Sequence, residues 1–67
     1  MVDTQMKPRR IVRTDKTTGE VVDVGRWDAA QELRVFYFPL MPVLDGLETG
    51  TLRQLETPNA FWTSEEP

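Results

Sequence analysis

The 67-residue chain carries a formal net charge of −3 and contains neither cysteine nor histidine. This length allows one domain, and the missing residue types exclude disulfides, thiolate metal sites and the commonest neutral metal ligand. A chain this short buries only about 60% of its unfolded surface, so its core is marginal. Two explanations stay open: a modest core that suffices alone, or a partner that stabilises the fold.

Charge is divided unevenly along the chain. Residues 1–16 contain five basic and two acidic residues, whereas residues 35–67 contain one basic and five acidic residues. This asymmetry indicates a basic N-terminal arm and an acidic C-terminal tail. We therefore expect a flexible or docking arm at residues 1–8, a single small β-rich domain at 9–62 and an acidic tail at 63–67.

No stretch has the pattern of a targeting or membrane-spanning segment. The N-terminus lacks an apolar run, and the longest apolar stretch has about ten residues, two of them proline, whereas a membrane helix needs about 20. We expect a cytoplasmic or virion-associated protein with no visible signal peptide and no membrane contact.

The best-defined predicted element is an N-terminal β-hairpin. Arg9–Thr14 and Glu20–Val24 are rich in β-branched residues, and Asp15–Gly19 between them has the composition of a turn. The Asp15 side chain can accept hydrogen bonds from the turn backbone. Gly19 can supply a positive φ without steric strain.

The centre of the chain is ambiguous between helix and strand. Good helix formers at 28–32 favour a helix that begins there. Against a longer helix, Val35–Phe38 has a strong β preference, and Pro39 ends any helix at or before the preceding residue. We favour one helical turn or an extended loop at 28–32, followed by a strand at 33–38, with a continuous helix as the alternative.

Turn signals divide the rest of the chain. Asp45-Gly46 and Thr49-Gly50 indicate turns, and residues 51–56 fit either a last strand or a short helix. Asn59–Trp62 is an aromatic segment that closes over the core. The expected fold is mainly β: a small open barrel or a three- to four-stranded antiparallel sheet with an N-terminal hairpin and possibly one short helix.

The side chains that catalysis requires are scarce. The single serine, Ser64, lies in the expected tail, and the two lysines, Lys7 and Lys16, lie outside any segment that would bury them. The acidic residues do not have the spacing of a calcium loop. We expect no enzymatic activity, no cofactor and no metal.

Aromatic and proline-bracketed residues are the strongest candidates for binding another protein. In a strand, Phe36 and Phe38 would point into the core and Tyr37 outward. Trp27 and Phe61 are expected in the core, while core and surface positions both stay open for Tyr37 and Trp62. The predicted protein-binding residues are Tyr37, Pro39, Leu40, Met41 and Trp62.

The basic arm is the second binding candidate. Lys7, Arg9, Arg10 and Arg13 could neutralise nucleic-acid phosphates, or they could protect an edge strand from pairing. The acidic composition of the whole chain favours the second interpretation.

The expected function is therefore a non-enzymatic protein–protein interaction module. Examples are an accessory subunit, a phage or virion structural component, or a small inhibitor of a larger machine. Its partner would be another protein, a larger assembly or a second copy of the chain. The alternative is a nucleic-acid-binding small β-barrel that uses the basic arm, and the salt dependence of binding to random DNA or RNA distinguishes the two.

Overall fold

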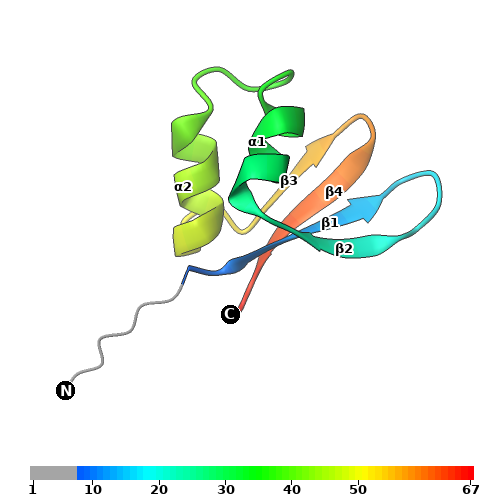
Figure 1. Cartoon of the computed structure of the whole chain (residues 1–67), viewed down its shortest axis with the longest axis horizontal. Coiled ribbons are helices and arrows are strands. Elements are labelled where there is room, and N and C mark those ends of the chain that lie inside the picture. Colours follow the sequence, from blue (N-terminus) through cyan, green and yellow to red (C-terminus); the bar gives the residue numbers. More distant parts are fainter. Residues whose placement is uncertain (1–7) are drawn as a thin grey trace.

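The computed structural model describes residues 8–67, so the predicted arm lies, except for Pro8, outside the described residues. A four-stranded antiparallel sheet is packed against two helices (Figure 1). In chain order the elements are β1 (Arg10–Asp15), β2 (Val21–Val24), α1 (Arg26–Leu33), α2 (Met41–Thr49), β3 (Gln54–Thr57) and β4 (Ala60–Glu65). The strand order β2-β1-β4-β3 places β1 and β4 side by side in the centre. The predicted small antiparallel sheet is thereby confirmed in its open form.

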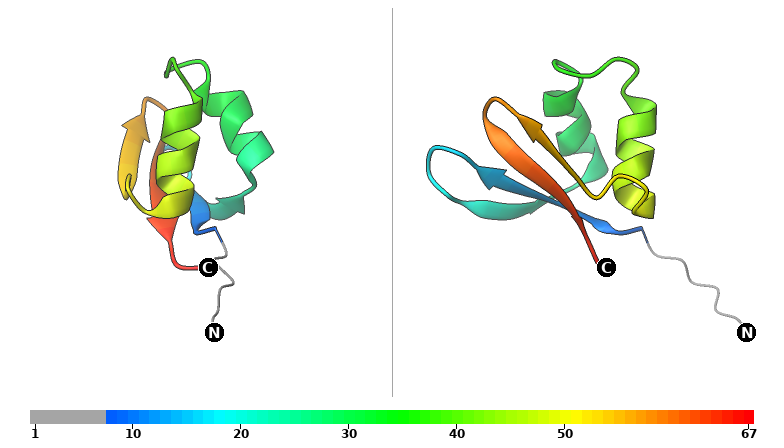
Figure 2. Two further views of the ribbon diagram at one scale, coloured as in Figure 1. Left: turned by 90° about the vertical axis from the view of Figure 1, so that its left-hand side faces the viewer. Right: turned by 180° about the vertical axis from the view of Figure 1, so that it is seen from behind.

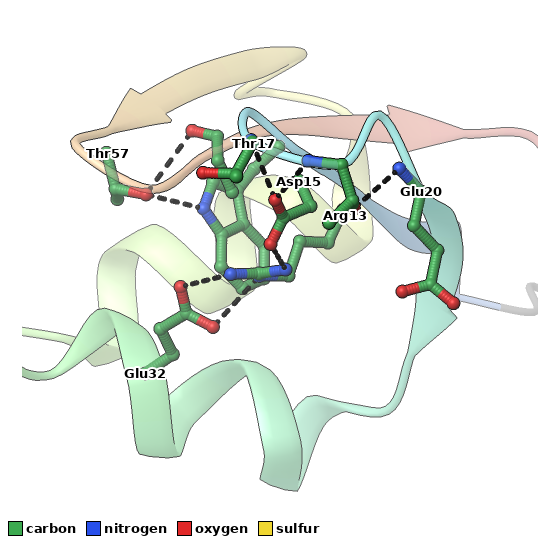
Figure 3. Close-up of polar contacts among 9 residues, drawn as sticks. Arg13, Asp15, Thr17, Glu20, Glu32 and Thr57 are labelled. Atoms are coloured by element: carbon green, nitrogen blue, oxygen red, sulfur yellow. Dashed lines mark hydrogen bonds and ion pairs between the residues drawn. The ribbon is translucent and has the colours of Figure 1, made fainter.

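The N-terminal hairpin forms as predicted, with β1 and β2 antiparallel. One carboxylate oxygen of Asp15 accepts hydrogen bonds from the backbone N–H groups of Thr17 and Thr18, at 2.8 and 2.9 Å (Figure 3). Gly19 adopts a φ of +77°, a conformation in which a Cβ atom would be strained. The turn is therefore determined by its own residues.

Acidification is expected to weaken this turn. The hydrogen bonds from Thr18 and Thr17 hold the pKa of Asp15 below its ordinary value. A carboxyl group with a lowered folded-state pKa contributes stability above its unfolded pKa, and this contribution is lost as the pH falls through the folded pKa. An NMR titration should give Asp15 a pKa below that of an unfolded peptide, about 3.9, and Asp15→Asn should remove this part of the acid dependence. A titration at the ordinary value would contradict the assignment.

The C-terminal hairpin completes the sheet. β3 confirms the strand alternative for residues 54–56 of the segment 51–56, and β4 begins in the predicted aromatic segment. β4 also includes Thr63–Glu65, which the sequence pattern places in a polar tail. Ser64 is buried there because its hydroxyl group donates to the Leu47 carbonyl oxygen and accepts a hydrogen bond from Arg9 Nε at 2.8 Å.

The predicted strand at 33–38 is wrong. α1 ends at Leu33, and the N–H groups of Phe36 and Tyr37 both turn back to donate to the Leu33 carbonyl oxygen at 2.9 Å. Ala29 and Leu33, one helical turn apart, are both buried. The two hairpins already supply four strands, and burial of this helical stripe outweighs the local β preference of the residues that follow.

A second helix, α2, follows where the sequence pattern does not indicate one. Pro42 lies in its first turn, where the missing N–H group breaks no hydrogen bond. The turn predicted at Asp45-Gly46 is wrong, because both residues lie inside α2. Gly50 does end the helix, with a φ of +88°.

Both helices cover the same face of the sheet (Figure 2). The core between the two layers consists of Ile11, Ala29, Leu33, Leu44, Leu47, Ala60 and Trp62. Trp62 is 1% exposed, and its Nε1 donates to Thr57 Oγ1 at 3.1 Å. The Arg13 guanidinium lies over the Trp62 ring, 5.6 Å from its centre, and donates to both carboxylate oxygens of Glu32 at 2.9 and 3.0 Å (Figure 3). This ion pair joins β1 to α1 beside the core.

Two aromatic residues predicted in the core are exposed instead. Trp27 is 74% exposed because the stripe of α1 that meets the sheet is Ala29 and Leu33, and residue 27 lies outside it. Phe61 is 47% exposed because it alternates with the buried Trp62 along β4 and therefore lies on the sheet face that the helices leave open.

The orientation predicted for residues 36–38 is inverted. Phe38 is 98% exposed and Phe36 is 41% exposed, while Tyr37 is half-buried and packs against the core. The Tyr37 hydroxyl group donates to the Glu56 carbonyl oxygen at 3.2 Å. The inversion follows from the missing strand, since alternation no longer decides which of the three side chains turns inward.

Candidate functional site: an apolar groove between the helices

Exposed apolar side chains gather on the helical layer. A groove of about 430 Å³ is formed by residues of α1 and α2 and of the connection that precedes α2, and its walls are mostly apolar. The residues that line this interhelical groove are Arg26, Trp27, Ala30, Leu40, Met41 and Leu44. Because the groove lies beside the core, the residues at its floor are held by core packing, while the residues at its rim are exposed to solvent.

Trp27 and Met41 are the exposed residues of the groove, at 74% and 54%. Leu44 is 2% exposed and belongs to the core. Trp27 and Ala30 are three residues apart on α1, a spacing that places side chains on one helical face. The groove therefore combines a rigid apolar floor with a large aromatic side chain that the protein itself leaves mostly uncovered.

Arg26 supplies the charged group of the groove and joins the two helices. Its guanidinium group donates to Asp45 at 3.0 Å and to Glu48, and its Nη2 lies 3.7 Å from Met41 Sδ. Hydrogen bonds to Asp45 and Glu48 raise the pKa of Arg26, so this residue stays protonated. Since α1 and α2 together carry one basic and four acidic residues, the helical layer has net negative charge.

The structure brings two of the predicted protein-binding residues into the groove, Leu40 and Met41. Pro39 is exposed immediately before them. Tyr37 is engaged with β3, and Trp62 is buried in the core, so neither contributes to the groove surface.

The sequence pattern misses Trp27, Ala30 and Leu44 as groove residues. The apolar positions 27 and 30 would indicate a second apolar face of α1 beside the buried stripe. That signal is readable only once the segment is assigned as a helix, and its extent was the ambiguous feature of the sequence.

The arginines predicted to contact nucleic acid are engaged with acceptors of the chain itself. Arg9 donates to the hydroxyl and carbonyl oxygens of Ser64, at 2.8 and 3.0 Å. Arg10 donates to both carboxylate oxygens of Asp23, at 2.9 and 3.1 Å, and to the Glu66 carbonyl oxygen at 2.7 Å. These contacts tie the first strand to its neighbours on both sides.

Arg13 and Lys7 complete the predicted basic set. Arg13 is half-buried in its ion pair with Glu32, and these hydrogen bonds raise its pKa. Lys7 lies outside the described residues. The basic residues that the structure describes in β1 and just before it therefore serve the fold.

Reactive side chains in the described residues are dispersed or engaged. Ser64 is held by its two hydrogen bonds, and the Lys16 ammonium group pairs with Glu56 and lies 4.8 Å from the centre of the Phe61 ring. Residues 8–67 contain no group of three or more acidic, histidine or cysteine side chains placed to hold a metal ion. Within the same range, neither helix has the length and apolar character required to cross a membrane.

Comparison with known proteins assigns the chain to no family. No family model matches it, and no curated protein and no solved structure matches it significantly. Its function is therefore inferred from the geometry and chemistry of its surface.

Proposed function

We propose that this protein is a non-enzymatic protein-binding module, an accessory component whose interhelical groove receives an apolar segment of another protein. The observation that carries the proposal is Trp27, which leaves 74% of its surface exposed beside an apolar groove. Tryptophan is among the residues most enriched at the energetic centres of protein interfaces. Covering its ring with a partner removes a large apolar area from water.

Charge indicates the kind of partner. The single basic residue of the two helices, Arg26, is already paired with Asp45 and Glu48. The other charges of the helices are Asp28 and Glu32, and Glu32 is paired with Arg13 of β1. The helices keep a net negative charge, and complementary potentials favour a partner with basic residues around its apolar contact. An amphipathic helix with a basic polar face has this chemistry and is the shape that a groove between helices accepts.

The same contacts weigh against the nucleic-acid-binding alternative. Arg9, Arg10 and Arg13 donate to oxygen atoms of the chain itself. Binding to phosphates would require these side chains to exchange those partners, and the negative helical layer would repel the backbone of a nucleic acid.

Trp27→Ala is expected to abolish most partner binding while leaving the fold intact. The partner is first identified from native lysate with a photo-reactive amino acid placed at position 41, an exposed position of the groove that leaves Trp27 in place. Its affinity for purified variants is then measured by calorimetry. Loss of a central interface tryptophan typically costs 2 kcal/mol or more, a loss of roughly 30-fold in affinity. The exposure of Trp27 predicts unchanged circular dichroism and an unfolding midpoint close to the wild-type value.

Phe61→Ala is the matched control, because Phe61 is an exposed aromatic residue on the opposite face of the sheet. It should bind the partner as the wild type does. Equal affinity of the Trp27→Ala and wild-type proteins for the partner would refute the groove as the binding site. Binding to random DNA with a steep dependence on salt would instead support the nucleic-acid alternative.

A further inference from the structure

The two edges of the sheet are not equivalent, and the difference can be derived from backbone contacts. In an antiparallel ladder, consecutive residues direct their N–H and C=O groups alternately to one side and the other. The N–H group of Asp15 donates to the Glu20 carbonyl oxygen at 2.8 Å, so the backbone N–H and C=O groups of Glu20 point toward β1. With the register of Arg13 opposite Val22, the alternation continues along β2.

The backbone groups of Val21 and Asp23 therefore point away from the sheet. β2 is the end strand of the sheet order, and no element lies beyond it in the described chain (Figure 1). Among residues 8–67, no donor or acceptor makes a hydrogen bond to these two N–H and two C=O groups. We call the strand Val21–Val24, with these four outward backbone groups, the β2 edge.

The opposite edge, at β3, is partly covered. The N–H group of Ser64 donates to the Arg53 carbonyl oxygen at 2.8 Å, so by the same alternation Gln54 and Glu56 point outward. The outward carbonyl group of Glu56 already accepts the Tyr37 hydroxyl group at 3.2 Å. This contact covers part of the edge with a side chain.

The β2 edge lacks several of the features that usually prevent strand pairing, although the strand is short, with four residues. It contains no proline and no lysine, while Val21 is 61% exposed and Val22 is 37% exposed. Its one charge, Asp23, is neutralised by two hydrogen bonds from Arg10. Free backbone groups between exposed valines specify an extended chain as the ligand.

We infer that the β2 edge pairs with the β2 edge of a second copy of the chain, forming a continuous eight-stranded sheet across a two-fold axis. The self-complementarity of the strand supports this occupant. When Val22 lies opposite Val22 of the second chain, Val21 lies opposite Asp23 of that chain. Asp23 in turn lies opposite Val21 of the second chain. All four outward groups of each strand then find partners, with no like charges directly opposite.

The alternative registers are poorer. Moving the pairing by two residues in one direction places Asp23 opposite its own copy, and like charges in that position are destabilising. Moving it in the other direction places the turn residue Gly19 within the paired segment. The pairing about Val22 therefore uses the whole strand and avoids both problems.

Two-fold symmetry about this edge keeps both helical layers on the same face of the extended sheet. The axis runs perpendicular to the sheet, so it reverses the strand direction and preserves the face. The two interhelical grooves then lie on one side of the dimer. The inference does not depend on the proposed function, since it concerns a different surface.

A single cysteine tests the register directly, because the chain has no cysteine of its own. Val22→Cys places two thiols opposite each other in a non-hydrogen-bonded pair, where the Cβ atoms lie close enough for a disulfide. Mild oxidation should convert the Val22→Cys protein largely into a covalent dimer. The control Gln54→Cys, on the β3 edge, should remain monomeric on a denaturing gel.

Val21→Pro tests the backbone contacts. The N–H group of Val21 points outward, so proline at this position removes no hydrogen bond between β1 and β2. Sedimentation velocity over a range of concentrations should show wild-type dimerisation, and Val21→Pro should weaken it at least about tenfold. The control Gln54→Pro removes an outward N–H group from the β3 edge and should leave dimerisation unchanged.

Three outcomes would overturn the inference. These are a wild-type protein that stays monomeric at every concentration, equal cross-linking at positions 22 and 54, or dimerisation that Val21→Pro leaves unchanged. Partner binding through the interhelical groove can survive each of these results, so failure here is distinguishable from failure of the proposed function.

Discussion

Trp62→Ala is expected to remove most of the stability of the folded protein. Trp62 is 1% exposed in the central strand β4 and is the largest fully buried side chain. Truncation of a buried tryptophan costs about 3–5 kcal/mol. A single core in a domain of this size supplies roughly that amount in total. The variant should therefore be largely unfolded at room temperature.

The loss has two components besides the cavity. The Trp62 indole N–H donates to Thr57 Oγ1, which would lose this partner in the interior. The Arg13 guanidinium stacks over the same ring, and it would lose that surface while its ion pair with Glu32 remains.

Trp27→Ala is a control of identical chemistry. Trp27 is 74% exposed, so its removal should change the free energy of unfolding by less than about 0.5 kcal/mol. Urea unfolding followed by far-ultraviolet circular dichroism would measure both variants. Similar unfolding midpoints for the two alanine variants would contradict the assignment of Trp62 to the core.

Gly46→Val is expected to destabilise the protein by about 3 kcal/mol, the upper part of the range for atoms forced into a packed region. A Cβ atom at Gly46 would lie 2.8 Å from Leu52 Cβ and 3.5 Å from the Leu52 backbone nitrogen. The chain cannot move away easily, because the N–H groups of Gly50 and Leu52 both donate to the Gly46 carbonyl oxygen, at 2.9 and 3.0 Å.

Gly25→Val is the matched control for that change. Gly25 precedes α1 with a φ of −72°, which any residue adopts, and a Cβ atom there meets nothing within 4 Å. Thermal and urea unfolding should show a loss below about 1 kcal/mol, consistent with the modest effect of residues at this helix position. If Gly46→Val were as stable as Gly25→Val, the close approach of α2 and Leu52 would be refuted.

The N-terminal hairpin could be predicted from sequence because its determinants are local. The Asp15 side chain and Gly19 act on backbone atoms a few residues away, and β-branched residues flank them. The same reasoning identified Gly50 as a chain-reversing residue. In each case the conformation depends on steric and hydrogen-bonding preferences that a residue carries in any context.

The candidate site could be predicted only in part. The apolar segment between Pro39 and Pro42 predicts Leu40 and Met41 as binding residues, and both line the interhelical groove. The sequence pattern places Trp27 in the core, because apolar content alone does not distinguish a buried tryptophan from an exposed one. That distinction needed the direction of the buried stripe on α1, which comes from packing.

The sequence by itself determined the N-terminal hairpin and the chain reversal at Gly50. The tertiary structure decided the conformation of residues 33–38. Two hairpins already form the complete sheet, and burial of one face of that sheet by helices outweighs the β preference of this segment. The tertiary structure also decided that Trp62 is buried and Trp27 is not. Burial depends on which face of each element meets the other layer, and the pairing of β1 with β4, about 50 residues apart in sequence, fixes that arrangement.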